Sequence, residues 1–130
     1  ILVNNAALAG HCVLEDEVIV GGLSGVHQFV RIGRGAMIGA VTMVTADVIP
    51  HGLVQGPRGT LDGLNLVGLK RRGAAREEIA ALRDLLQALS QGAFRETARA
   101  RADAGGDGAL VREVLDFILG PSDRSFLTPR

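Results

Sequence analysis

The residues of this sequence whose side chains suit chemistry are few, and the three histidines come first. A histidine titrates near neutral pH, so it can act as a base, a hydrogen-bonding group or a metal ligand. His51 follows Pro50, and we expect it to be a structural loop residue that needs no partner. His11 and His27 are expected to face one shared binding groove. No third ligand accompanies them, and a zinc site needs at least three protein ligands, so no metal site is predicted.

The second candidate is the basic run Lys70-Arg71-Arg72. One interpretation is a solvated surface in front of a helix. The other is a phosphate site, because a planar guanidinium pairs with two oxygens at once. The start of the following helix would then add a favourable dipole. Asn65, a short distance upstream, would supply one neutral donor and one neutral acceptor.

A six-residue repeat must position these side chains. Aliphatic residues occupy every sixth position at Leu2, Leu8, Leu14, Val20, Val26, Ile32, Ile38 and Val44. A period of six fits neither an α-helix nor a simple two-sided strand. It is typical of a hexapeptide β-helix, in which each hexad forms one side of a coil. Residues 2–55 then make three coils. Glycines such as Gly21, Gly33 and Gly39 are expected at the corners, where unusual backbone angles are needed.

The pattern changes after Pro50, and the chain divides into three parts. Residues 1–55 form the β-helix coils, 56–73 a loop that carries the basic run, and 74–130 a small helical C-terminal domain. Four glycines and one proline within 52–63 favour a loop there. Apolar residues at helical spacing predict helices from 74 onward, around 94–102 and around 110–118. The fold class is therefore all-β plus α.

Composition excludes several classes of function. Fourteen basic and fourteen acidic residues cancel, which argues against binding nucleic acid or a membrane surface by bulk charge. No apolar stretch approaches the ~20 residues of a membrane span. The single cysteine, Cys12, forms no internal disulfide and fits a reducing compartment. Because the chain opens on Ile1 inside the repeat, we interpret it as N-terminally truncated.

Three segments carry a family resemblance. Residues 4–11 (Asn-Asn-Ala-Ala-Leu-Ala-Gly-His), 21–29 (Gly-Gly-Leu-Ser-Gly-Val-His-Gln-Phe) and 63–73 (Gly-Leu-Asn-Leu-Val-Gly-Leu-Lys-Arg-Arg-Gly) closely resemble the acyl-carrier-protein-dependent UDP-N-acetylglucosamine O-acyltransferases of lipid A biosynthesis. The third segment is the most specific, because hexapeptide proteins in general lack it. The resemblance implies a homotrimer of left-handed parallel β-helices in the bacterial cytoplasm. Active sites would lie in grooves between neighbouring subunits.

The resemblance also implies a reaction, and this reaction needs no cofactor. The 3-hydroxyl of UDP-N-acetylglucosamine attacks the thioester of a 3-hydroxyacyl-carrier protein, with a histidine as general base. The backbone N–H of Gly10 would bind the oxyanion, and His11 would orient groups in the groove. The substrate-binding residues that it implies are His27, Gln28, Asn65, Arg71 and Arg72.

Three positions depart from the family pattern. The family's catalytic histidine belongs to a His-Asp pair upstream of Asn4, so this chain alone is expected to be inactive. Val67 replaces an acidic residue that commonly contacts the nucleotide. Ala40 replaces the glycine that limits acyl length, and its methyl group is expected to shorten the preferred acyl chain by about one carbon.

Other hexapeptide proteins remain as alternatives. The related N-acyltransferase of the same pathway uses the same acyl donor, but would not be expected to carry the segment 68–73. A γ-class carbonic anhydrase needs three zinc histidines on adjacent coils, which this sequence does not have. A non-catalytic trimerisation scaffold would have no need of Gln28 or Arg71.

Overall fold

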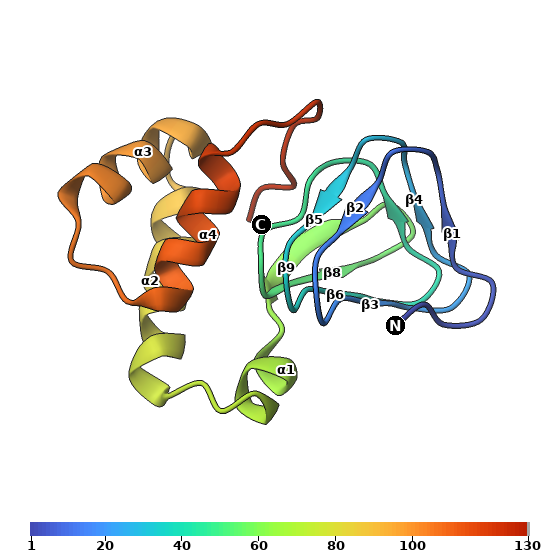
Figure 1. The fold of residues 1–130 in the computed structure, drawn as a ribbon, viewed down its shortest axis with the longest axis horizontal. Helices are drawn as coiled ribbons and strands as arrows, with labels where there is room; N and C mark the ends of the chain where they lie inside the picture. Colours follow the sequence, from blue (N-terminus) through green and yellow to red (C-terminus); the bar gives the residue numbers. More distant parts are fainter. Residues whose placement is uncertain (130) are drawn as a thin grey trace.

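The computed structural model describes residues 1–129 and consists of a coil of short strands beside a cluster of helices (Figure 1). Seven two-residue strands make the coil: β1 (Ala7–Leu8), β2 (Val13–Leu14), β3 (Ile19–Val20), β4 (Gly25–Val26), β5 (Arg31–Ile32), β6 (Met37–Ile38) and β7 (Met43–Val44). They start every sixth residue, as the repeat predicts. Each strand ends at a turn, so the chain changes direction once per hexad.

The strands pair in parallel with the coil above, at a step of 18 residues. Ala7 pairs with Gly25, Val13 with Arg31, and Ile19 with Met37. This register generates three sheets, β1–β4–β7, β2–β5 and β3–β6–β8–β9. The predicted β-helix with three hexads per coil is therefore confirmed. The last coil is shorter, because Ile38 pairs with Val54 and Ile32 bridges to Val48.

The repeated aliphatic side chains fill the interior of the coil. Val20, Val26, Ile32, Ile38 and Val44 are all buried. The small or β-branched residues four positions later are buried beside them, for example Ser24, Val30 and Ala36. Leu2 and Leu8 of the first coil are exposed, because no coil lies beneath them here.

The corners of the coil differ from the prediction. Left-handed backbone angles recur at six-residue spacing at Asn5, His11, Glu17, Leu23, Phe29, Gly35 and Val41, of which only one is glycine. Gly21 and Gly33 lie outside that conformation, and they are needed for close packing instead. A Cβ atom on Gly21 would lie 2.5 Å from the backbone nitrogen of Ala40. A Cβ atom on Gly33 would overlap Pro50.

Residues 52–63, predicted as a loop, form a hairpin. Strand β8 (Gly52–Gln55) extends the sheet of β3 and β6, and β9 (Thr60–Leu64) pairs with it antiparallel. Val54, Leu61 and Leu64 are buried. Glycine usually weakens a strand, which hid this apolar pattern in the sequence.

Four helices follow the hairpin. Helix α1 (Leu66–Arg71) lies in the segment 56–73, where the sequence predicts only a loop. Helices α2 (Arg76–Ser90), α3 (Phe94–Ala104) and α4 (Ala109–Leu119) lie within 74–130, where the sequence predicts helices. Their apolar faces pack together in one buried cluster. Within residues 1–129, none of these helices is long and apolar enough to cross a membrane.

The segment after α4 returns to the coil and ties the two parts together (Figure 1). The N–H of Asp47 donates to the carbonyl of Ser125, and the N–H of Leu127 donates to the carbonyl of Asp47. The Asp47 side chain is fully buried and pairs with Arg31 at 3.1 Å. The Arg31 guanidinium also lies 4.1 Å from the ring centroid of Phe117 on α4.

Candidate functional site

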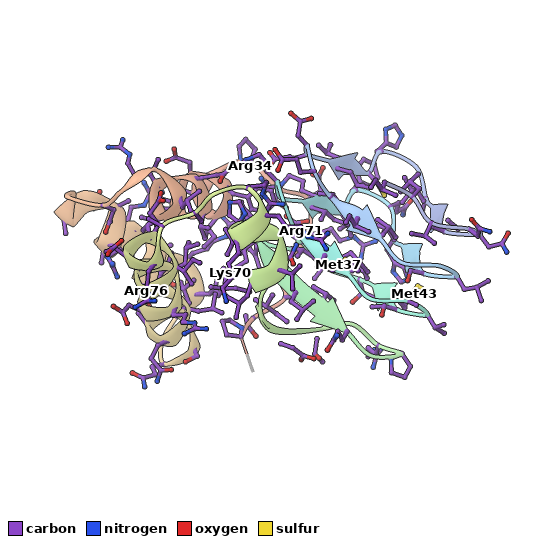
Figure 2. The ribbon with its side chains drawn as sticks, turned by 90° about the horizontal axis from the view of Figure 1, so that it is seen from below. Arg34, Met37, Met43, Lys70, Arg71 and Arg76 are labelled. Atoms are coloured by element: carbon purple, nitrogen blue, oxygen red, sulfur yellow. The ribbon has the colours of Figure 1, made fainter. Side chains whose placement is uncertain are left out.

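A groove of about 780 Å³ runs between α1 and the outer face of the β3–β6–β8 sheet. Its polar lining comes from Glu17, Asn65, Arg71 and Arg72, and its apolar lining includes Met37 and Val67. Figure 2 shows Arg71 on α1 beside the strands that carry Met37. The structure thus brings Asn65, Arg71 and Arg72 to one groove, whereas Lys70 of the basic run does not line it.

Asn65 begins α1 and braces it against the coil. Its Oδ1 accepts from the N–H of Gly68 at 3.1 Å, so the side chain caps the helix. Its Nδ2 donates to the carbonyl of Gly35 at 3.0 Å. Both ends of the amide are therefore engaged within the chain.

The basic run lies at the end of a helix instead of before one. Lys70 and Arg71 occupy the last turn of α1, and α2 begins only at Arg76. The predicted support from a helix N-terminus is wrong, because the short helix α1 was not foreseen. The C-terminal end of a helix favours cations, so the helix stabilises these side chains instead of a bound anion.

Arg71 and Arg72 differ in their surroundings. The Arg71 side chain is exposed and makes no hydrogen bond or ion pair with the residues that the structure describes. The Nε of Arg72 pairs with the Glu17 carboxylate at 2.9 Å. The Nη2 of Arg72 lies 3.2 Å from Nδ1 of His51 and 3.5 Å from the Gly35 carbonyl oxygen. Its Nη1 has no partner within residues 1–129. The whole Arg71 guanidinium is therefore free to bind a ligand, whereas Arg72 has only its Nη1 free.

His51 is buried and partnered, contrary to the expectation of a loop residue without partners. Its Nε2 lies 2.7 Å from Oε1 of Glu113 on α4, and its Nδ1 faces Arg72. Burial lowers the pKa of His51, the contact with Glu113 opposes that shift, and the nearby arginines add to it. The structural role expected for His51 holds, although it acts as the centre of a polar cluster.

Glu113 joins that cluster to Arg34 of the coil. Arg34 approaches the Glu113 carboxylate through Nε at 2.6 Å and Nη2 at 3.0 Å. This hydrogen-bonded pair raises the pKa of Arg34. Burial alone would raise the pKa of Glu113, but its bonds to Arg34 and His51 outweigh burial and lower that pKa. These side chains surround one corner of the coil, between the β2–β5 and β3–β6–β8 sheets. We call it the arginine corner, and it comprises residues 15–18, 33–36 and 49–51.

The second group of predicted residues lies at another corner. Gly10, His11, His27 and Gln28 lie in residues 9–12 and 27–30, between the β1–β4–β7 and β2–β5 sheets, which we call the histidine corner. The ring of His11 stacks on Phe29, with centroids 4.8 Å apart and planes 7° apart. This contact follows from the 18-residue step, and the sequence analysis missed it. Gln28 is exposed, and the Gly10 N–H has no acceptor within residues 1–129.

The predicted site residues therefore divide between corners. Asn65 and Arg72 contact the arginine corner at Gly35 and Glu17. The imidazoles of His11 and His27 lie at the histidine corner. Ala40 is exposed at the third corner, between the β3–β6–β8 and β1–β4–β7 sheets. One copy of the chain does not bring these groups into one pocket. The contacts of Glu17 and Glu113 were not predicted either. For Glu17 the sequence held one indication, because the 18-residue step places it under Gly35 at the same corner.

Parallel strands β1 to β7, which stack at an 18-residue step into three sheets, and an appended helical cluster define a hexapeptide-repeat β-helix protein. The sequence profile described as "Udp N-acetylglucosamine O-acyltransferase; Domain 2" matches residues 47–127. The chain belongs to this UDP N-acetylglucosamine O-acyltransferase family.

Curated relatives that match almost the whole of this chain belong to the same family by name. The acyl-(acyl-carrier-protein)–UDP-N-acetylglucosamine O-acyltransferase of Paracoccus denitrificans is 83% identical over 129 residues, which cover 99% of this chain and 49% of the relative. The protein of the same name from Sinorhizobium fredii is 45% identical, with 99% of this chain and 48% of the relative covered. The chain thus spans about half the length of the curated relatives it matches.

Solved structures give the same result. The UDP-N-acetylglucosamine acyltransferase from Campylobacter jejuni has a TM-score of 0.90 at 36% identity, covering 99% of this chain and 50% of that one. The Francisella novicida UDP-N-acetylglucosamine acyltransferase has a TM-score of 0.90 at 30% identity, covering 99% and 48%.

Proposed function

We propose that this chain is part of an enzyme that transfers a 3-hydroxyacyl group from acyl-carrier protein to the 3-hydroxyl of UDP-N-acetylglucosamine. This is the first step of lipid A biosynthesis. The observation that carries the proposal is the groove beside α1, in which Arg71, Arg72 and Asn65 meet. Family membership supports the substrate and argues against the related N-acyltransferase.

The nucleotide is bound at the arginine corner. Arg71 supplies a free guanidinium for the diphosphate, and Arg72 adds its unpaired Nη1. Asn65 holds α1 in place and keeps one amide hydrogen for the sugar or nucleotide. Val67 lines the same groove without a carboxylate, and among the described lining residues Glu17 is the only acid.

The acyl transfer takes place at the histidine corner. The Gly10 N–H, free of acceptors in the chain, is suited to stabilise the developing oxyanion. His11, His27 and Gln28 contact or orient the sugar and the thioester. His51 is too buried to act as base, and we assign the general base to a residue outside this chain.

The two corners combine between protomers of a homotrimer. Each protomer is a left-handed parallel β-helix, as the similarity to the solved acyltransferases supports. The histidine corner of one copy faces the arginine corner of its neighbour, because neither corner can reach the other within one chain. The enzyme works in the bacterial cytoplasm and needs no cofactor.

Titration of UDP-N-acetylglucosamine into the full-length protein tests this function. We expect Arg71→Ala and Gln28→Ala each to weaken binding by about tenfold or more, since each removes a polar contact to the ligand. Equal binding by the wild type and both variants, or binding by none, would favour a non-catalytic hexapeptide scaffold.

A further inference from the structure

His51 contacts both ends of the segment 65–72, which lines the nucleotide groove. Its backbone carbonyl accepts from the N–H of Asn65 at 2.7 Å. Its ring Nδ1 faces Nη2 of Arg72 at 3.2 Å. His51 Nδ1 also lies close to Gly35, since a Cβ atom there would be 2.7 Å from it, and the Gly35 carbonyl accepts from Asn65 and Arg72. His51 is thus one of two coil side chains that contact Arg72, the other being Glu17.

The contacts determine the protonation of the ring. Arg72 offers only donors, so Nδ1 of His51 must be the acceptor and carries no proton. The proton then resides on Nε2, which donates to the Glu113 carboxylate at 2.7 Å. The imidazole is neutral, and it links α4 of the helical part to the guanidinium in the groove.

We propose that His51 is a positioning residue for UDP-N-acetylglucosamine, whose neutral imidazole, held by Glu113, aims the Arg72 guanidinium into the groove beside α1. This inference rests on the function proposed above. The other side-chain partner of Arg72 is Glu17, whose side chain is 44% exposed, so solvent screens that pair. The contact with His51 lies in the interior, where the ring is 1% exposed and its orientation is set by packing.

A pH dependence follows from this geometry. The charged groups that face His51 are Glu113 from α4, Arg34 from the coil below and Arg72 after α1, with Glu17 behind Arg72. Protonation of Nδ1 would place an N–H against the guanidinium, and two donors cannot bond to each other. Arg72 would then turn away from its bound orientation. Burial lowers the pKa of His51 below its ordinary value, so the contact is intact at neutral pH and is lost as the pH falls through that lowered pKa.

Calorimetric titration of UDP-N-acetylglucosamine into the full-length protein between about pH 5 and 8 tests the proposal. The diphosphate of this ligand is esterified at both ends and does not titrate in that range. In the wild type, affinity should decline on the acid side. His51→Gln should bind about tenfold more weakly at neutral pH and lose the part of the acid decline that His51 causes.

Two carboxylate variants of α4 complete the experiment. Glu113→Gln should move the acid decline to lower pH, because the carboxylate that favours the imidazolium is gone. The matched control is Asp116→Asn, an exposed carboxylate on the same helix, which should bind as the wild type does. If His51→Gln does not fold, the shift in Glu113→Gln decides the matter.

The outcomes separate the two proposals. Suppose Arg71→Ala weakens binding, yet His51→Gln matches the wild type at every pH. The positioning role is then refuted, and the proposed function stands. An acid decline that is unchanged in Glu113→Gln refutes the role in the same way. Absence of binding by the wild type refutes both.

Discussion

At the scale of single residues, the corners of the coil decide which side chains face a ligand. Phe29, Gly35 and Val41 have positive φ, and each donates its N–H to a carbonyl of the coil below. For a residue other than glycine this conformation costs roughly 1 kcal/mol. The inter-coil hydrogen bonds offset that cost, and the same geometry places His11 on the surface.

A substitution at Ala40 tests the acyl-length role that the family resemblance implies for this residue. Replacing it with glycine removes the methyl group that is expected to limit the length of the acyl chain. We expect Ala40→Gly to lengthen the preferred acyl chain by about one carbon, since a hydrophobic pocket discriminates one methylene by ~1–3 kcal/mol. Rates with carrier proteins of graded acyl length measure this in the full-length enzyme. An unchanged profile would contradict the role of Ala40.

At the scale of elements, the stacking of one coil on the next limits the size of the residues that follow each strand. Gly33 follows β5 and packs closely against Pro50 of the coil above. A Cβ atom on Gly33 would lie 2.4 Å from the Pro50 nitrogen. Gly33 is fully buried, and its N–H donates to the carbonyl of Val48 at 2.9 Å. The shortened last coil depends on this close approach.

Gly33→Ala is therefore expected to be destabilising. The added methyl group overlaps Pro50, and overpacking of this kind costs about 1–3 kcal/mol in free energy of unfolding. Gly10→Ala is the matched control, because nothing lies within 4 Å of its Cβ position, and it should stay within about 0.5 kcal/mol of the wild type. Denaturant unfolding measures both, and equal stabilities would show that the coils can separate.

At the scale of the whole molecule, two clusters of charged side chains help to join the helical part to the coil. One is the cluster of Arg34, His51 and Glu113 at the arginine corner. The other is Asp47, which binds Arg31 and the hydroxyl of Ser122 in the returning C-terminal segment. The first lies beside the groove at α1, since His51 contacts Arg72, and both depend on contacts between residues distant in sequence.

Asp47→Asn should loosen the second junction. It removes the buried charge that neutralises Arg31, and breaking such a pair costs about 3 kcal/mol in free energy of unfolding. Asp103→Asn, at an exposed carboxylate of α3, should change stability by less than about 0.5 kcal/mol. Thermal and denaturant unfolding compare the two, and equal effects would mean that Asp47 does not hold the junction.

The sequence predicted what depends on local spacing and missed what depends on docking. Every sixth aliphatic residue, from Val20 to Val44, identified the coil, because the period alone determines which side chains point inward. The hairpin and α1 were missed, since their glycines conceal apolar residues such as Leu61. The cluster around His51 gave no signal, because Glu113 reaches it only after α4 packs on the coil.

The central claim is that one binding site needs two copies of the chain, with Gln28 from one and Arg71 from the next. The most direct test co-assembles full-length Gln28→Ala with full-length Arg71→Ala and measures UDP-N-acetylglucosamine binding. Neither variant alone should bind well. In the mixed assembly about one interface in four should pair two intact corners, so strong sites should reappear at that fraction. If no strong site reappears although the two variants assemble together, both residues belong to a site within one chain, and the account is wrong.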